Sequence, residues 1–109
     1  MQVPDRGDLV YVNFHPQAGH EQDGRRPAIV LSPKAFNEVT KFAVVCPITS
    51  REKGYPFEVK LPEDLPIQGV VLTDQVKSLD WRARRFRIEG RAPVEVVQEC
   101  LDLIHTFLS

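Results

Sequence analysis

Hydrophobic residues occur in short runs or in alternation along most of the chain, as they do in β-strands. In residues 8–14, Val10, Val12 and Phe14 alternate with other residues and so share one face. The segments with a strand pattern are residues 8–14, 27–33, 41–49, 57–61, 70–79 and 84–90. The two almost entirely apolar ones, 27–33 and 41–49, predict buried strands.

Two further segments depart from simple strand patterns. Residues 70–79 predict a long, bent strand, and residues 34–40 predict a connector with one helical turn.

After Pro93, a residue type favoured at the start of helices, apolar residues recur at steps of three and four. They form two stripes, Val94, Val97, Leu101, Ile104 and Leu108 in one and Val96, Cys100, Leu103 and Phe107 in the other. One stripe suffices for packing on a core, so the second predicts either a subunit contact or a deeply buried helix.

About five or six short strands, separated by turns and followed by one helix, predict a mainly β fold shaped as a small, strongly bent barrel. The length of 109 residues fits one domain spanning residues 1–109. The hydrophobic share of 42% supports one compact core, and this composition is not that of a disordered chain.

The cysteines and histidines indicate no metal chemistry. Cys46 and Cys100 fall within apolar patterns and are predicted to be core residues, and no paired-cysteine motif occurs. The three histidines are far apart in sequence, so we expect neither a metal site nor a cofactor. The N-terminus lacks the pattern of a signal peptide, and no apolar run approaches the ~20 residues of a membrane span. We therefore expect a cytoplasmic protein without a membrane partner.

Charge is unevenly distributed beneath a net charge of −1. Residues 77–91 contain six basic residues and two acidic ones, with Trp81 among the arginines. Such a cluster is typical of a site for a polyanion or an acidic peptide, although a solvated strand edge gives the same composition. Arg25 and Arg26 form a second basic site where a polar loop meets an apolar strand. They predict either phosphate binding or surface pairing with Glu21 or Asp23.

Four blocks in the same order carry a resemblance to a known family: "GDLVYVNFHPQAGHEQDGRRPAIVLSP", "CPIT", "KGYPFEV" and "LTDQVKSLDWRAR". Together they extend from Gly7 to Arg84 and resemble the MazF toxins of the PemK/Kid superfamily. The resemblance implies an SH3-like barrel of the type found in CcdB and PemK toxins, with a C-terminal helix, acting as a homodimer. It also implies sequence-specific, metal-independent cleavage of single-stranded mRNA by the toxin of a type II toxin–antitoxin system.

The resemblance assigns roles to individual residues. It implies a catalytic pair, Arg26 and Thr49, together with Glu21, and it implies that Lys53 and Gln75 contact RNA. We expect the RNA-binding residues to be Arg25, Lys53, Tyr55, Gln75, Lys77, Trp81, Arg82 and Arg84. The implied partner besides RNA is an acidic antitoxin of the MazE type, with DNA contacted only through the antitoxin complex.

Some alternatives stay open at this point. The general base is either Glu21 or His20, and Glu21 has the clearer family counterpart; Glu21 could instead orient Arg26 through an ion pair. Thr49 could simply be a turn residue that binds its own backbone. The function has two rivals, a toxin of the same fold that binds a topoisomerase, as CcdB does, and an RNA-binding module that does not cleave.

Overall fold

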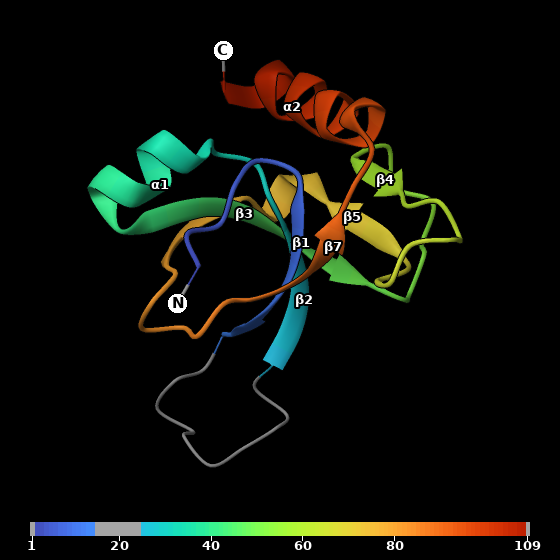
Figure 1. Ribbon diagram of the computed structural model, residues 1–109. Coiled ribbons are helices and arrows are strands. Elements are labelled where there is room, and N and C mark those ends of the chain that lie inside the picture. Colours follow the sequence, from blue (N-terminus) through green and yellow to red (C-terminus); the bar gives the residue numbers. More distant parts are fainter. Residues whose placement is uncertain (1, 15–24, 109) are drawn as a thin grey trace.

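The structure is a computed structural model, and it describes residues 2–14 and 25–108. Within these ranges the chain forms a curved antiparallel sheet with a helix at its C-terminal end (Figure 1). The strands are β1 (Asp8–Asn13), β2 (Arg25–Val30), β3 (Phe42–Thr49), β4 (Glu58–Lys60), β5 (Val70–Leu72), β6 (Lys77–Asp80) and β7 (Arg87–Arg91). The helices are α1 (Lys34–Thr40) and α2 (Val94–Leu108), and a 3₁₀ turn, η3 (Thr73–Gln75), lies between β5 and β6. The predicted mainly β fold with a C-terminal helix is confirmed, with seven strands instead of five or six.

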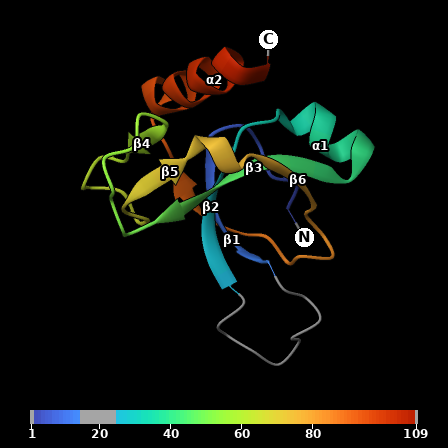
Figure 2. The same cartoon turned by 180° about the vertical axis from the view of Figure 1, so that it is seen from behind.

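The sheet is bent around β3. Its order is β4-β5-β3-β2-β1-β7, and β6 also pairs with β3. The first half of β3 pairs with β6, and its end pairs with β5. Figure 2 shows β3 crossing from the side of α1 to the side of β4 and β5. Among the described strands no pairing joins β4 to β7, so the sheet curls like a barrel without closing.

Alternation along the strands creates two apolar cores, one on each face. One core contains Val10 and Val12 of β1, and Phe14 packs against it, as predicted from their shared face. The other lies beneath α2 and includes Leu9, Cys46 and Cys100. Both cysteines are free and buried, which confirms their prediction as core residues. Burial raises the pKa of each thiol to about 12.

Helix α2 packs on the core with one face only. Val96, Val97 and Cys100 are buried, whereas Val94 is 75% and Leu108 66% exposed. The prediction of a deeply buried helix is therefore wrong. At the C-terminal end of the helix, Phe107 and Leu108 remain exposed in the single chain. Leu108 also lines an apolar groove between α1 and α2, together with residues such as Phe36 and Leu101.

Two predicted strands are shorter in the structure because hydrogen bonds impose other conformations on part of each segment. The segment 70–79 is broken by η3, because the amide and hydroxyl of Thr73 both donate to the Phe57 carbonyl, at 3.2 and 2.6 Å. The predicted strand 84–90 begins only at Arg87. Before it, the Asp80 carboxylate accepts hydrogen bonds from the backbone of the following turn, and Arg85 adopts a φ of 54°.

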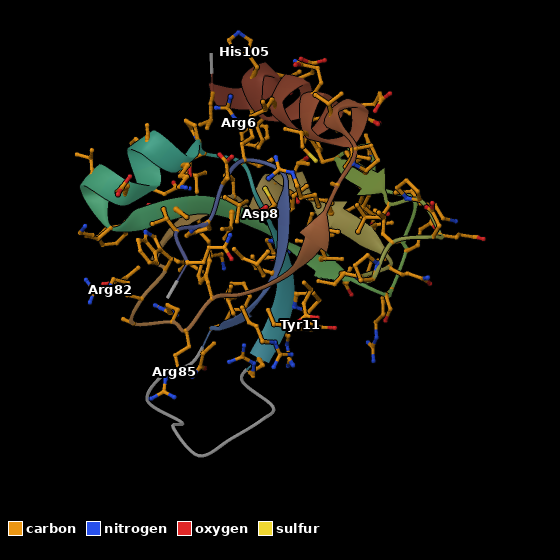
Figure 3. All side chains as sticks on the ribbon, viewed as in Figure 1. Arg6, Asp8, Tyr11, Arg82, Arg85 and His105 are labelled. Atoms are coloured by element: carbon orange, nitrogen blue, oxygen red, sulfur yellow. The ribbon has the colours of Figure 1, made fainter. Side chains whose placement is uncertain are left out.

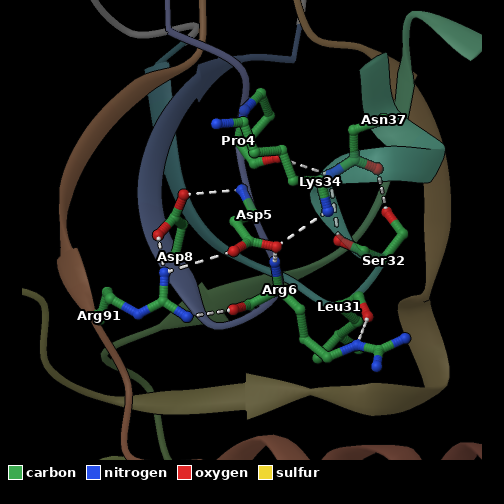
Figure 4. Close-up of polar contacts among 9 residues, drawn as sticks. All are labelled: Pro4, Asp5, Arg6, Asp8, Leu31, Ser32, Lys34, Asn37 and Arg91. Carbon is green, nitrogen blue, oxygen red and sulfur yellow. Dashed lines mark hydrogen bonds and ion pairs between the residues drawn. The ribbon is translucent and has the colours of Figure 1, made fainter. Parts of the chain in front are cut away.

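A polar network ties the N-terminal segment to β7 and α1 (Figure 4). Arg91 donates to the buried carboxylate of Asp8 at 3.0 Å and to the Arg6 carbonyl at 2.7 Å. The backbone N–H of Lys34 donates to Asp5 at 2.9 Å, which is the main reason that the pKa of Asp5 is lowered. Burial raises the pKa of Asp8, and Arg91 opposes that shift. The guanidinium of Arg91 is thus committed to partners within the protein.

Candidate functional site

The register of β2 and β3 brings Arg26 and Thr49 together. Ala28 pairs with Pro47 in this antiparallel ladder. Continuing the same register by two residues sets Arg26 opposite Thr49, with both side chains on the face of that pair. Directly opposed residues of antiparallel strands have Cβ atoms about 5 Å apart. Arg26 and Thr49, which lie on either side of α1 in the sequence, therefore meet where β2 begins and β3 ends.

Arg26 and Thr49 line a common pocket of about 330 Å³. Its polar and aromatic side chains are Phe14, Arg26, Thr49, Gln75 and Lys77. Lys77 reaches the pocket because it pairs with Val45 at the start of β6, and Gln75 precedes it in η3. Four of the predicted site residues, drawn from three separate segments, therefore meet in one place.

A second pocket of about 150 Å³ adjoins the first and shares Thr49 and Gln75 with it. Its wall includes Lys53 and Tyr55, two more of the residues expected to bind RNA, as well as Arg51 and the acidic residues Glu58 and Asp74. The two pockets share Thr49, Leu72 and Gln75, and we call them together the strand-end site. An anionic ligand that spans both pockets would meet Arg26 and Lys77 in the larger one and Lys53 in the smaller one.

Thr49 is held by its own backbone and by a glycine. Its hydroxyl oxygen accepts a hydrogen bond from the Arg51 N–H at 3.1 Å, so the hydroxyl proton is left for another acceptor. Gly69 lies against it with φ at +122°, and a Cβ at that position would collide with the Thr49 carbonyl. Only glycine fits here, and its close approach fixes the backbone of Thr49.

The two adjacent arginines point in different directions, as alternate residues of a strand must. Arg26 is exposed, and within residues 2–14 and 25–108 its side chain has no carboxylate partner, only a 3.4 Å contact with the Arg25 carbonyl. Arg25 is half-buried and donates to the carbonyls of Tyr11 and Arg85, each at 3.4 Å. The site thus receives Arg26 and not Arg25.

The basic cluster at residues 77–91 is divided in the same manner. Trp81 is 4% exposed, and its indole N–H donates to the Asn37 carbonyl at 2.8 Å. It belongs to the core, which argues against the expected role in RNA binding, because no ring face is free to stack on a base. Arg84 donates to the Phe14 carbonyl at 2.6 Å. Arg82 lies outside the strand-end site and points outward from the turn, as does Arg85 (Figure 3).

Phe14 was not among the residues predicted for the site. Its ring lines the larger pocket, and the Lys77 ammonium lies 5.2 Å from the ring centroid. The alternation in β1 assigns Phe14 to a core face but does not show that the strand ends at a pocket. The candidate bases Glu21 and His20 lie outside the described residues.

Residues 2–14 and 25–108 contain no group of three or more His, Cys, Asp or Glu side chains placed to hold a metal ion. No helix in these ranges has the length and apolar character needed to cross a membrane.

Comparison with known proteins gives consistent matches. Residues 5–108 match the family model described as the PemK-like, MazF-like toxin of type II toxin–antitoxin systems. The endoribonuclease toxin MazF of Escherichia coli strain K12 is 49% identical over 96 residues, which covers 88% of this chain and 86% of the relative. The crystal structure of MazF from Deinococcus radiodurans is 56% identical, with a TM-score of 0.89, and the match covers 99% of this chain and 98% of that one. A MazE–MazF structure from the same organism matches at 49% identity and a TM-score of 0.89, over 100% of this chain and 98% of that one.

Proposed function

Because the chain belongs to the PemK-like, MazF-like toxin family of type II toxin–antitoxin systems, we propose that it is an endoribonuclease that cleaves single-stranded mRNA in the strand-end site. The reaction uses no metal ion, and cleavage of mRNA halts translation and growth. The observation that carries this proposal is that Arg26 and Thr49 line one pocket with two further groups able to bind RNA, Gln75 and Lys77.

The chemistry uses the substrate's own 2′-hydroxyl as the nucleophile. Its oxygen attacks the adjacent phosphorus, and the bond from phosphorus to the 5′-oxygen breaks. The products are a 2′,3′-cyclic phosphate and a 5′-hydroxyl. The reaction needs a base for the 2′-hydroxyl proton, a proton for the leaving oxygen, and stabilisation of the crowded phosphorane.

Arg26 supplies the stabilisation. Its planar guanidinium can bind two phosphate oxygens at once. The exposed side chain lines the larger pocket, and within the described residues it has no carboxylate partner. Thr49 donates its free hydroxyl proton to a non-bridging oxygen and fixes the orientation of the phosphate. Glu21, ahead of His20, is the proposed base.

The remaining residues of the site hold the RNA on either side of the scissile phosphate. Single-stranded RNA is read by stacking bases on planar side chains and by hydrogen bonds to their edges. Tyr55, with 57% of its surface exposed, provides a ring face, and Phe14, whose ring lies against the Lys77 ammonium, adds apolar contact. Gln75 provides an amide for a base edge, while Lys53 and Lys77 bind phosphates.

The partner of this chain is an acidic antitoxin of the MazE type, consistent with the MazE–MazF complexes formed by its structural relatives. Its acidic residues bind the cationic strand-end site, and its apolar residues bind beside it. Association should therefore be fast and sensitive to salt. Competition between labelled RNA and an antitoxin peptide tests this, because independent binding of both ligands contradicts a shared site.

The protein acts as a homodimer in the cytoplasm. The support for the dimer is the exposed apolar end of α2 at Phe107 and Leu108 and the apolar groove beside it, which a second copy would bury. Sedimentation at micromolar concentration should give a dimer. A species of 12.4 kDa alone would contradict this.

The test of the proposed function is incubation with a mixed-sequence RNA in EDTA. We expect discrete cuts with cyclic phosphate ends, and no cut where a single 2′-deoxynucleotide replaces the nucleophile. RNA retention without cuts would indicate a binding module, and neither binding nor cuts would favour a topoisomerase-binding toxin. The matched family does not favour that last alternative.

A further inference from the structure

An acidic side chain lies where the proposed ligand is a polyanion. Glu58 is the first residue of β4, and it lines the smaller pocket beside Lys53 and Tyr55. A carboxylate in such a place repels the phosphates of RNA. Its contacts with the protein show what it contributes instead.

The Glu58 carboxylate is bound by two successive backbone N–H groups. The N–H of Lys53 lies 3.2 Å from both carboxylate oxygens, and the N–H of Gly54 lies 3.0 Å from Oε1. Consecutive N–H groups directed at one anion form a concave anion site, here filled by a side chain of the same turn. Gly54 has φ at +79°, a conformation that glycine adopts without strain. The turn is closed by the N–H of Glu58, which donates to the Tyr55 carbonyl at 3.1 Å.

The same turn is fastened to the rest of the site. The Phe57 carbonyl accepts both hydrogen bonds from Thr73, the first residue of η3. Gln75, at the other end of η3, lines both pockets. The ring of Phe57 also packs edge-on against Phe107 of α2, with centroids 5.7 Å apart. The turn is thus anchored at Phe57, and its free part, which carries Lys53 and Tyr55, is ordered by Glu58.

We propose that Glu58 is a positioning residue for RNA binding: its carboxylate holds the Lys53–Gly54 backbone so that Lys53 and Tyr55 face the strand-end site. This inference rests on the proposed function, because it assumes that RNA occupies the site. It predicts that removing a negative charge from an anion-binding pocket weakens anion binding, which is the opposite of what simple electrostatic repulsion predicts.

The test compares Glu58→Gln with a matched control, Asp74→Asn. Asp74 lines the same pocket, and in the part of the chain described here its carboxylate has no hydrogen-bond partner. The probe is an RNA with a 2′-deoxynucleotide at the cleaved position, so that binding is measured without cleavage. We expect about tenfold weaker binding for Glu58→Gln and slightly tighter binding for Asp74→Asn. Binding by Glu58→Gln that equals or exceeds the wild type overturns the proposal.

A double-mutant cycle separates positioning from a general loss of structure. If Glu58 acts through Lys53, Lys53→Ala weakens binding in the wild type but has less than about a twofold effect in Glu58→Gln. Equal effects in both backgrounds contradict the proposal. Urea unfolding of each variant identifies any that fail to fold, and Glu58→Gln keeps the size of the side chain. If the wild type itself neither binds nor cleaves RNA, the proposed function fails instead.

Discussion

Arg26 and Arg91 have the same side chain in opposite circumstances. Arg91 donates to the Asp8 carboxylate and to the Arg6 carbonyl at the N-terminal network. Arg26 lies near the start of β2 and lines a pocket, and within the described residues no carboxylate pairs with it. One guanidinium closes the fold, and the other lines the proposed RNA site.

The N-terminal network and the strand-end site both contain arginine. They differ in the hydrogen-bond acceptors that the protein places around it. Within the basic cluster at 77–91, Arg84 and Arg91 are bound to the protein, whereas Lys77 faces the pocket. A cluster counted along the sequence therefore overstates the surface that can bind a polyanion. What marks the strand-end site is a cation beside a hydroxyl and an amide, with no carboxylate bound to that cation in residues 2–14 and 25–108.

The sharpest way to break this comparison is to remove the proposed catalytic pair. Arg26→Ala and Thr49→Ala should each lower the cleavage rate by on the order of 10²–10³, because each loses a preorganised group at the phosphorane. The free energy of unfolding should stay close to that of the wild type, since neither residue closes the core. Cleavage of a fluorogenic RNA in EDTA measures the first quantity, and urea unfolding measures the second.

Arg25→Ala is the internal control for that pair. Arg25 points to the opposite face of β2 and contacts only carbonyls of the protein in the described structure. Its loss should lower cleavage far less than that of Arg26. If Arg25 proves to be the essential arginine, the residue assignment derived from the register is off by one.

A glycine tests whether the backbone of Thr49 must stay in place. Gly69→Ala introduces a Cβ that collides with the Thr49 carbonyl, at a φ of +122° that alanine does not adopt without strain. A displacement of about 1 Å near the reacting groups can lower a rate by on the order of 10². We expect a loss of that size in cleavage at saturating RNA. A folded Gly69→Ala protein with wild-type activity would show that Thr49 needs no such restraint.

The complementary variant removes Arg91, the arginine that is bound within the protein. Arg91→Ala leaves the Asp8 carboxylate buried without its cation, and should lower the free energy of unfolding by about 1–3 kcal/mol. Cleavage by the folded protein should be unchanged, because Arg91 does not line the strand-end site. Urea unfolding and the RNA assay on one preparation check both expectations.

The pH dependence of that deficit follows from the pKa of Asp8. Burial raises this pKa, and Arg91 opposes the shift, so the variant raises it further in the folded state. A raised folded-state pKa means that the folded protein binds the proton more tightly, and acidification then favours folding. The stability deficit of Arg91→Ala should therefore be smaller at about pH 4 than at about pH 7. A deficit that grows on acidification contradicts this origin.

The smallest expected effect concerns Lys77. Lys77→Ala should weaken RNA binding by about fivefold, as expected for one exposed phosphate contact. It should also reduce the slope of log affinity against log salt concentration by about 0.7, the value for one phosphate of a single strand. Arg82→Ala, in a turn outside the pockets, should change the slope less. Equal slopes for the two variants would mean that the whole basic cluster contacts RNA.

The sequence predicted those parts of the fold that follow from local periodicity. The face shared by Val10 and Val12, the strand predicted at 41–49 and observed as β3, and the helix after Pro93 all match. The interruption at η3 depends on Thr73 bonding to Phe57, a contact between distant residues that no local pattern shows. For the same reason Trp81 was misassigned: its partner is a carbonyl in α1.

The candidate site was predicted more through family resemblance than through pattern. Thr49 alone reads as a turn residue, and it does bind its own backbone. Its place beside Arg26 depends on the pairing of β2 with β3, and that of Gln75 on the bend at η3. Phe14 was missed because alternation identifies the face of a residue but not the end of the sheet at which a pocket opens.

The most direct test assays Arg26→Ala and Arg91→Ala side by side for cleavage and for unfolding. We expect Arg26→Ala to lose nearly all cleavage of RNA in EDTA and to unfold like the wild type. We expect Arg91→Ala to cleave like the wild type and to unfold at a lower urea concentration. If Arg91→Ala instead loses cleavage while folded, or Arg26→Ala cleaves normally, the division between a catalytic and a structural arginine is contradicted.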